Sequence, residues 1–158
     1  MEKNKLLPDY LGLWTKKEED LFGEEYFKYG IFSMWKKEKG VGKIWEMYLG
    51  ELKEADLTKL VDNKLQISFI KKYTKQHADL LKGNLTYSGI GNGDGFYDGK
   101  WTGKNIDGKE RRGEFFLADV KKEWAVEELG KIIGGLHLRD FDLRVRDLQE
   151  QFSYTPII

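Results

Sequence analysis

The chain has 158 residues, and 40% hydrophobic with 34% charged side chains predicts one packed globular domain. Lysine plus arginine equal aspartate plus glutamate at 27 each, so no net charge attracts phosphate or anionic lipid, and we expect neither nucleic acid nor membrane as a partner. The absence of cysteine, of a secretory apolar segment in the first ten residues and of any membrane-spanning apolar run predicts a cytoplasmic location.

The first part of the chain contains three segments that we predict to be strands, at residues 10–16, 26–36 and 43–50. Residues 26–36 carry apolar side chains at both odd and even positions. Both faces of that strand therefore need cover, and we expect another element to lie over the outside of the sheet.

The middle of the chain is punctuated by glycine, with nine of the 18 glycines between Gly83 and Gly113. They separate short segments rich in aromatic residues and threonine, which is typical of β-hairpins. Residues 91–95 and 106–108 predict tight turns. In residues 95–103, Tyr97 and Trp101 alternate with charged side chains, so we expect the aromatic face to point inward. Similar alternation in residues 65–73, 85–88 and 115–117 brings the number of predicted strands to seven.

The last third of the chain loses the glycine punctuation and gains a helical spacing. One predicted helix runs from about Val120 to Gly134, with Trp124, Leu129 and Ile133 on one face. Residues 138–152 favour a second helix. Residues 141–146 also alternate, so an eighth strand that closes a barrel is the competing interpretation of that segment.

The segment from Ser68 to Leu117 resembles the meander of small lipocalin-like and avidin-like β-barrels. The Gly12-Leu13-Trp14 sequence is similar to the Gly-x-Trp that opens many such barrels. The residues that carry the resemblance in the meander are Phe69, Lys71, Tyr73, Tyr87, Gly89, Asp94, Gly95, Gly99, Trp101, Gly103, Gly113, Phe115 and Leu117.

The resemblance implies a mainly β fold, an up-and-down antiparallel meander barrel of about seven or eight strands with a C-terminal helical segment. We expect a single domain over residues 1–158. The barrel would occupy residues 10–120, and residues 121–158 would form a helical extension packed on the barrel or on a partner. Barrels of this kind often hold a small molecule in their mouth, but the polar residues by which avidins bind biotin have no match here.

Motifs for catalysis and metal binding are missing from the sequence. His77 and His137 lie far apart and have no partner histidine at a ligand spacing. The glycine-rich turn at residues 91–95 has Ile90 where a calcium loop needs its first carboxylate. Neither a phosphate-binding loop nor a Gly-x-Ser-x-Gly motif is present, so we predict no metal, no cofactor and no enzyme activity.

The aromatic residues are the remaining unusual feature, and they have two interpretations. They fill the barrel, or they leave a ring-lined cavity for a small apolar or aromatic molecule. For the second, the predicted ligand-binding residues are Trp14, Trp45, Phe69, Tyr87, Tyr97 and Trp101. The alternative function is a filled barrel that acts as a protein-interaction or self-association module through the C-terminal segment.

Overall fold

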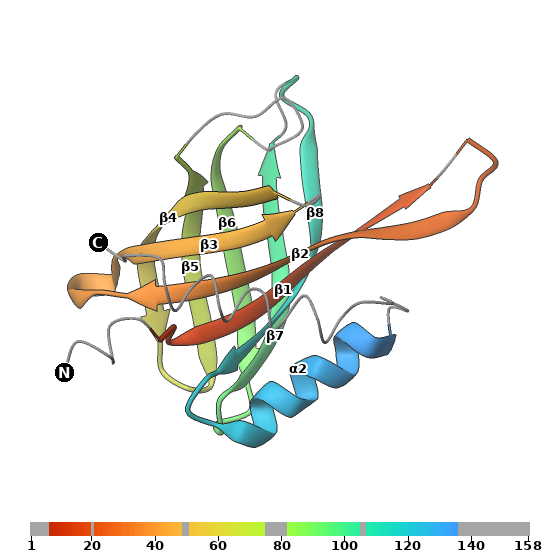
Figure 1. Cartoon of the computed structure of the whole chain (residues 1–158). Coiled ribbons are helices and arrows are strands. Elements are labelled where there is room, and N and C mark those ends of the chain that lie inside the picture. The colour runs from red at the N-terminus through yellow and green to blue at the C-terminus, as the bar shows by residue number, and fades with distance from the viewer. Residues whose placement is uncertain (1–6, 20, 49–50, 75–81, 105–106, 136–158) are drawn as a thin grey trace.

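The computed structural model describes residues 7–19, 21–48, 51–74, 82–104 and 107–135 (Figure 1). Eight antiparallel strands follow one another around a closed barrel in chain order. A short 3-10 turn, η1 (Glu38–Gly40), joins the second and third strands, and the helix α2 (Glu123–Gly135) follows the last. The strands are β1 (Tyr10–Glu19), β2 (Glu25–Lys36), β3 (Gly42–Tyr48), β4 (Glu51–Asp62), β5 (Gln66–Tyr73), β6 (Lys82–Gly91), β7 (Phe96–Lys104) and β8 (Glu110–Asp119).

The barrel closes because β1 pairs with β8 as well as with β2. The β1–β8 register runs from Tyr10 opposite Asp119 to Thr15 opposite Glu114. This confirms the predicted fold class, a mainly β up-and-down meander with a C-terminal helix. The competing interpretation of residues 141–146 is not needed for closure, since the described strands already close the barrel, and that segment lies outside the described residues.

The strand that the sequence prediction missed is β4. Its inward positions carry Lys53, Ala55 and Leu57, so hydrophobic alternation is weak exactly where the strand enters the barrel. Its outward positions mix apolar, charged and polar side chains: Leu52, Glu54, Asp56, Thr58 and Val61. A strand with a lysine and an alanine on its buried face has little of the pattern by which strands are recognised.

The barrel interior is packed with aromatic and aliphatic side chains from alternate positions of all eight strands. The rings of Phe69 and Tyr87 stack at its centre, with their centroids 4.7 Å apart, and Phe115 meets Tyr87 edge-on at 5.1 Å. The members of this interior cluster are Tyr10, Trp14, Phe32, Met34, Ile44, Ala55, Leu57, Ile67, Phe69, Leu85, Tyr87, Tyr97, Trp101, Phe115 and Leu117.

Cross-strand glycines make room for the largest rings. Trp14 lies opposite Gly30, and Trp101 lies opposite Gly113. A Cβ added at Gly30 would lie 2.3 Å from Nε1 of Trp14, and one added at Gly113 would lie 2.6 Å from Nε1 of Trp101. The indole rings therefore lie across the glycine backbone, which explains why this aromatic-rich sequence is also rich in glycine.

The outside of the barrel is covered on one side by α2, which packs against β1, β7 and β8 (Figure 1). Ala125, Leu129 and Ile133 of the helix are buried against the outward-facing side chains Leu11, Leu13, Ile31, Trp35 and Ala118. This confirms the expected outer cover and the first predicted helix. The second predicted helix, residues 138–152, lies outside the described residues. No helix in the described ranges is both long and apolar enough to cross a membrane.

The ring-over-glycine packing predicts the effect of a single methyl group. Gly30→Ala should destabilise the protein by about 1–3 kcal/mol, because the new Cβ overlaps the Trp14 ring in a filled interior. Urea denaturation followed by tryptophan fluorescence measures the change. Gly134→Ala is the matched control, because an added Cβ there meets no atom within 4 Å. Equal stability of the two variants would contradict this packing.

Candidate functional site

A buried ion pair lies inside the barrel, between Glu46 on β3 and Lys71 on β5. Both side chains are essentially inaccessible to solvent, at 0% and 1% exposure. Lys71 donates a hydrogen bond to the Glu46 carboxylate and a second, at 3.3 Å, to the Tyr87 hydroxyl. The Tyr73 hydroxyl donates to the other carboxylate oxygen of Glu46 at 2.6 Å. Lys53, also buried, stands directly opposite Glu46 in the β3–β4 register.

Aromatic rings surround the Lys71 ammonium. Its Nζ lies 4.6 Å from the ring centroid of Tyr73 and 5.6 Å from those of Phe32 and Tyr87. Burial lowers the pKa of Lys71, and the Glu46 carboxylate opposes that shift. Burial also raises the pKa of the Tyr87 hydroxyl well above its usual value. Charges placed in such surroundings cost desolvation free energy that an apolar core would not incur, and clusters of this kind mark functional sites.

Positive charge predominates among the inward-facing side chains at this end of the barrel. Arg111 on β8 shares the inward parity of Phe115 and is partly buried. On the rim, Glu18 lies 2.5 Å from Lys16 and 3.9 Å from Lys28, and the charge of Arg111 also acts on it. Further in, Glu46 pairs with Lys71 and stands opposite Lys53. Among the described side chains on this face, five basic residues therefore accompany two acidic ones.

The other end of the barrel is closed by a carboxylate that accepts from two tyrosines. Asp62, at the end of β4, accepts hydrogen bonds from Tyr10 at 2.5 Å and from Tyr97 at 2.8 Å. Burial and the Asp62 hydrogen bond raise the pKa of both tyrosine hydroxyls above the ordinary value. The two rings also meet edge-on, with centroids 6.3 Å apart. The two phenols thus tie β1 and β7 to the β4–β5 turn.

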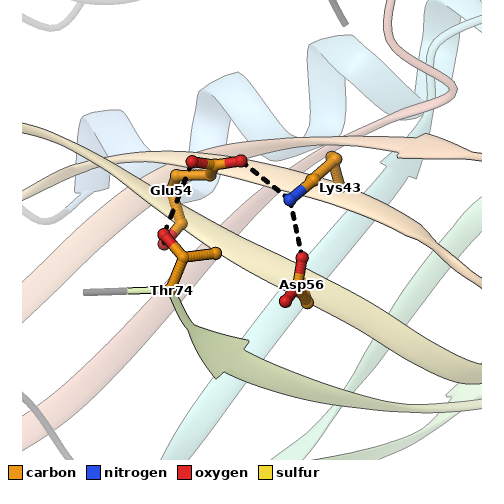
Figure 2. Close-up of polar contacts among 4 residues, drawn as sticks. All are labelled: Lys43, Glu54, Asp56 and Thr74. Carbon is orange, nitrogen blue, oxygen red and sulfur yellow. Dashed lines mark hydrogen bonds and ion pairs between the residues drawn. The ribbon is translucent and has the colours of Figure 1, made fainter. Parts of the chain in front are cut away.

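The outer surface has polar clusters of a different kind. On β3 and β4, Lys43 pairs with Glu54 at 2.8 Å and with Asp56 at 2.7 Å, and Thr74 approaches the Glu54 carboxylate at 3.4 Å (Figure 2). The hydrogen bond to Asp56 is the main reason why the pKa of Lys43 is raised. These partly exposed pairs link three neighbouring strands, and each contributes little to stability.

A hollow of about 750 Å³ lies on the outer face of β5 to β8. Its lining includes Ser68, Ser88, Asp98, Lys100 and Glu114. These residues alternate with the inward-facing ones, so the hollow is separated from the aromatic interior by the sheet itself. Its short hydroxyl side chains and its charges of both signs do not gather into a cluster of catalytic or ligand-binding groups.

The described residues contain no group of three or more histidine, cysteine, aspartate or glutamate side chains placed to hold a metal ion. His77 and His137 lie outside the described residues. The cluster around Lys71 therefore consists of one carboxylate, ammonium groups and phenols. It can bind and orient a charged group by hydrogen bonding.

The six predicted ligand-binding residues divide between the two faces of the sheet. Five pack together in the interior cluster: Trp14, Phe69, Tyr87, Tyr97 and Trp101. Trp45 does not join them, because its neighbours Ile44 and Glu46 face inward and Trp45 packs against the outer cluster beneath α2. Its expected place among the interior rings is therefore wrong. The binding role of the other five stays a prediction.

The buried charges were missed by the sequence analysis, although one signal pointed to them. Lys71 has the same parity as Phe69 and Tyr73, both expected to face inward, so a lysine on the buried face was readable. Glu46 and Lys53 gave no such signal, because the alternation in β3 was poor and β4 was not recognised.

Comparisons with known proteins add little. No model of a known protein family matches the chain, and no curated protein matches its sequence. Among solved structures, a provisionally assigned thioesterase II from Thermobifida fusca YX matches at 8% sequence identity with a TM-score of 0.26. The match covers 75% of this chain and 82% of that one. A likeness at this level carries no argument about fold or function.

The buried cluster predicts that the loss of Glu46 costs more folding stability than the loss of Lys71. Glu46→Gln should destabilise the protein by about 3–5 kcal/mol, because it removes the negative charge that the buried Lys71 pairs with and that stands opposite the buried Lys53. Lys71→Met should cost less, because Glu46 keeps the Tyr73 hydrogen bond and still faces Lys53. Urea denaturation near neutral pH measures both.

Lys131→Met, which removes an exposed pair with Glu128, is the control and should cost less than about 1 kcal/mol. A larger loss for Lys71→Met than for Glu46→Gln would contradict the assignment.

The raised pKa values of three tyrosines predict how the stability of the protein changes at alkaline pH. Because the pKa values of Tyr10, Tyr87 and Tyr97 are raised in the folded protein, the unfolded chain releases these protons first, and stability should fall as the pH rises above about 10. Phenolate absorbance followed during an alkaline titration should show a group of tyrosines, Tyr10, Tyr87 and Tyr97 among them, that ionises only when the protein unfolds. Tyr97→Phe should remove one of them. Smooth titration of all eight tyrosines before unfolding would contradict the buried positions.

Proposed function

We propose that this barrel binds a small organic anion with an apolar or aromatic body, at the end that carries Lys71, Lys53 and Arg111. The observation that carries the proposal is the excess of positive charge among inward-facing side chains there. An excess of positive over negative charge in low-dielectric surroundings is unfavourable, and a bound carboxylate would neutralise part of it.

The hydrogen-bonding capacity of the cluster supports an anion. The Lys71 ammonium has three N–H donors, of which two reach Glu46 and Tyr87. Arg111 offers a guanidinium fork that matches a carboxylate. Ammonium and guanidinium groups are donors only, so a ligand that accepts hydrogen bonds through charged oxygens suits them better than a neutral or cationic one.

The surroundings of the cluster support an apolar body on the ligand. Trp14, Tyr73 and Tyr87 present ring faces around Lys71, and Tyr73 is only partly buried, so it stands between the interior and the rim. Together with the eight-stranded meander and Trp14 of the Gly-x-Trp segment on its inner face, this supports a lipocalin-like binding barrel. Since the described interior is filled, we place the ligand above the ring cluster, at the end of the barrel.

A matched ligand series tests the proposal. 4-Phenylbutyrate should bind at least about tenfold more tightly than 4-phenylbutanol or 4-phenylbutylamine, because the two analogues share its body and lack the negative charge. Quenching of tryptophan fluorescence and isothermal titration calorimetry measure binding to the full-length protein.

Variants locate the site. Arg111→Gln should weaken 4-phenylbutyrate binding, and Lys100→Met, in the outer hollow, should leave it unchanged. If the carboxylate, the alcohol and the amine bind equally, or if only Lys100→Met weakens binding, the charged end of the barrel is not an anion site.

A further inference from the structure

The β1–β2 hairpin projects beyond the barrel as a two-stranded arm, residues 16–28 (Figure 1). β8 pairs with β1 only as far as Thr15, and β3 pairs with β2 only from Ile31 onward. Beyond these points the two strands pair only with each other, down to Glu19 opposite Glu25. An isolated two-stranded ribbon is marginally stable in water, so a projecting arm is a costly feature for a barrel that is already closed.

The tip of the arm exposes large apolar side chains in an acidic stretch of sequence. Leu21 is 100% exposed and Phe22 90% exposed, and Phe27 further down the arm is half-exposed. Residues 16–28 include five acidic residues and three lysines, and the lysines pair with Glu18 and Glu25, so the arm keeps a net negative charge. An apolar tip of this kind fits a contact surface that is apolar and positively charged.

The opposite end of the same chain has such a surface, which we call the basic end, residues 36–41 and 59–65. It carries Lys36, Lys37, Lys39, Lys59 and Lys64 against Glu38 and Asp62, and the carboxylate of Asp9 also lies here, where it accepts from the Lys36 N–H at 2.7 Å. Five lysines against three acids leave this end with a net positive charge. Val41, Val61 and Leu65 are each more than two-fifths exposed among these lysines. In Figure 1 the arm and the β2–β3 connection lie on opposite sides of the molecule.

Backbone conformation singles out the lysines of the basic end. Three non-glycine residues in the described ranges have positive φ, and all are lysines of this end: Lys39 at 62°, Lys59 at 52° and Lys64 at 73°. Glycine or asparagine would adopt this conformation at lower cost. Exposed lysines held there against their conformational preference indicate that their charge has a use outside the fold.

From this charge and shape complementarity we propose that the arm of one copy docks on the basic end of a second copy, so that the protein self-associates head to tail. This goes beyond the proposed function and is independent of the barrel interior. Two arms would repel each other through their net negative charge, and an anionic membrane would repel the arm for the same reason. Because the two surfaces lie on opposite sides of the molecule, the contact is heterologous and extends into chains unless it closes into a ring.

Sedimentation velocity on the full-length protein tests the contact. The weight-average mass should rise between about 10 and 500 µM protein at low ionic strength, and about 0.5 M salt should weaken the association at least tenfold. Leu21→Ser with Phe22→Ser should give a monomer. Glu127→Lys on the exposed face of α2 is the charge control and should associate as the unmodified protein does.

A charge exchange identifies the docking surface. Glu19→Lys with Glu24→Lys, and separately Lys39→Glu with Lys64→Glu, should each abolish association, and an equimolar mixture of the two variants should restore it. A monomer at every concentration, association that survives the tip substitutions, or a mixture that stays monomeric would each overturn the proposal.

Substitutions that relieve the backbone strain distinguish a role of these lysines in docking from a role in folding. The triple variant Lys39→Asn, Lys59→Asn and Lys64→Asn should keep or raise the thermal unfolding midpoint while it weakens association about tenfold. A lowered midpoint would show that the lysines serve their own fold, and would overturn this part of the argument.

Discussion

The pairing of β1 with β8 is the constraint on which the rest of the structure depends, because a closed sheet has one interior that alternate side chains must fill. Rings fill it here, and each large ring needs a small residue across the strand, which Gly30 and Gly113 supply to Trp14 and Trp101. The same closure leaves α2 to cover the outward apolar side chains of β1 and β8.

Closure also explains why the buried charges matter. In an open sheet Lys71 would reach water, but in a closed barrel it must find its partners among inward-facing neighbours. Glu46, Tyr73 and Tyr87 supply them from three different strands. Such a network costs more than an apolar core, and it lies at the end of the barrel where we propose that an anion binds. The arm and the basic end lie outside this interior, so the proposed self-association and the proposed ligand binding can be tested separately.

The fold was predictable from sequence wherever alternation was strong. Tyr97 with Trp101, and Phe69 with Tyr73, gave both the strands and their buried face, and the turn at residues 91–95 formed where glycine allows positive φ. β4 was missed because Lys53 and Ala55 occupy its inward positions. Trp45 was misplaced because aromatic character does not tell the two faces of a strand apart when both are covered. The ion pair was not predicted, because the alternation of β3 was too weak to place Glu46 inside and because β4, which lies between the strands of its two partners, was missed.

Crystals grown with 4-(4-bromophenyl)butyrate, and the anomalous signal of its bromine, test the central claim most directly. The account predicts one bromine peak at the end of the barrel beside Tyr73, with the carboxylate within hydrogen-bonding distance of Lys71 or Arg111. A peak in the outer hollow beside Ser88 and Lys100, with none at that end, would contradict it.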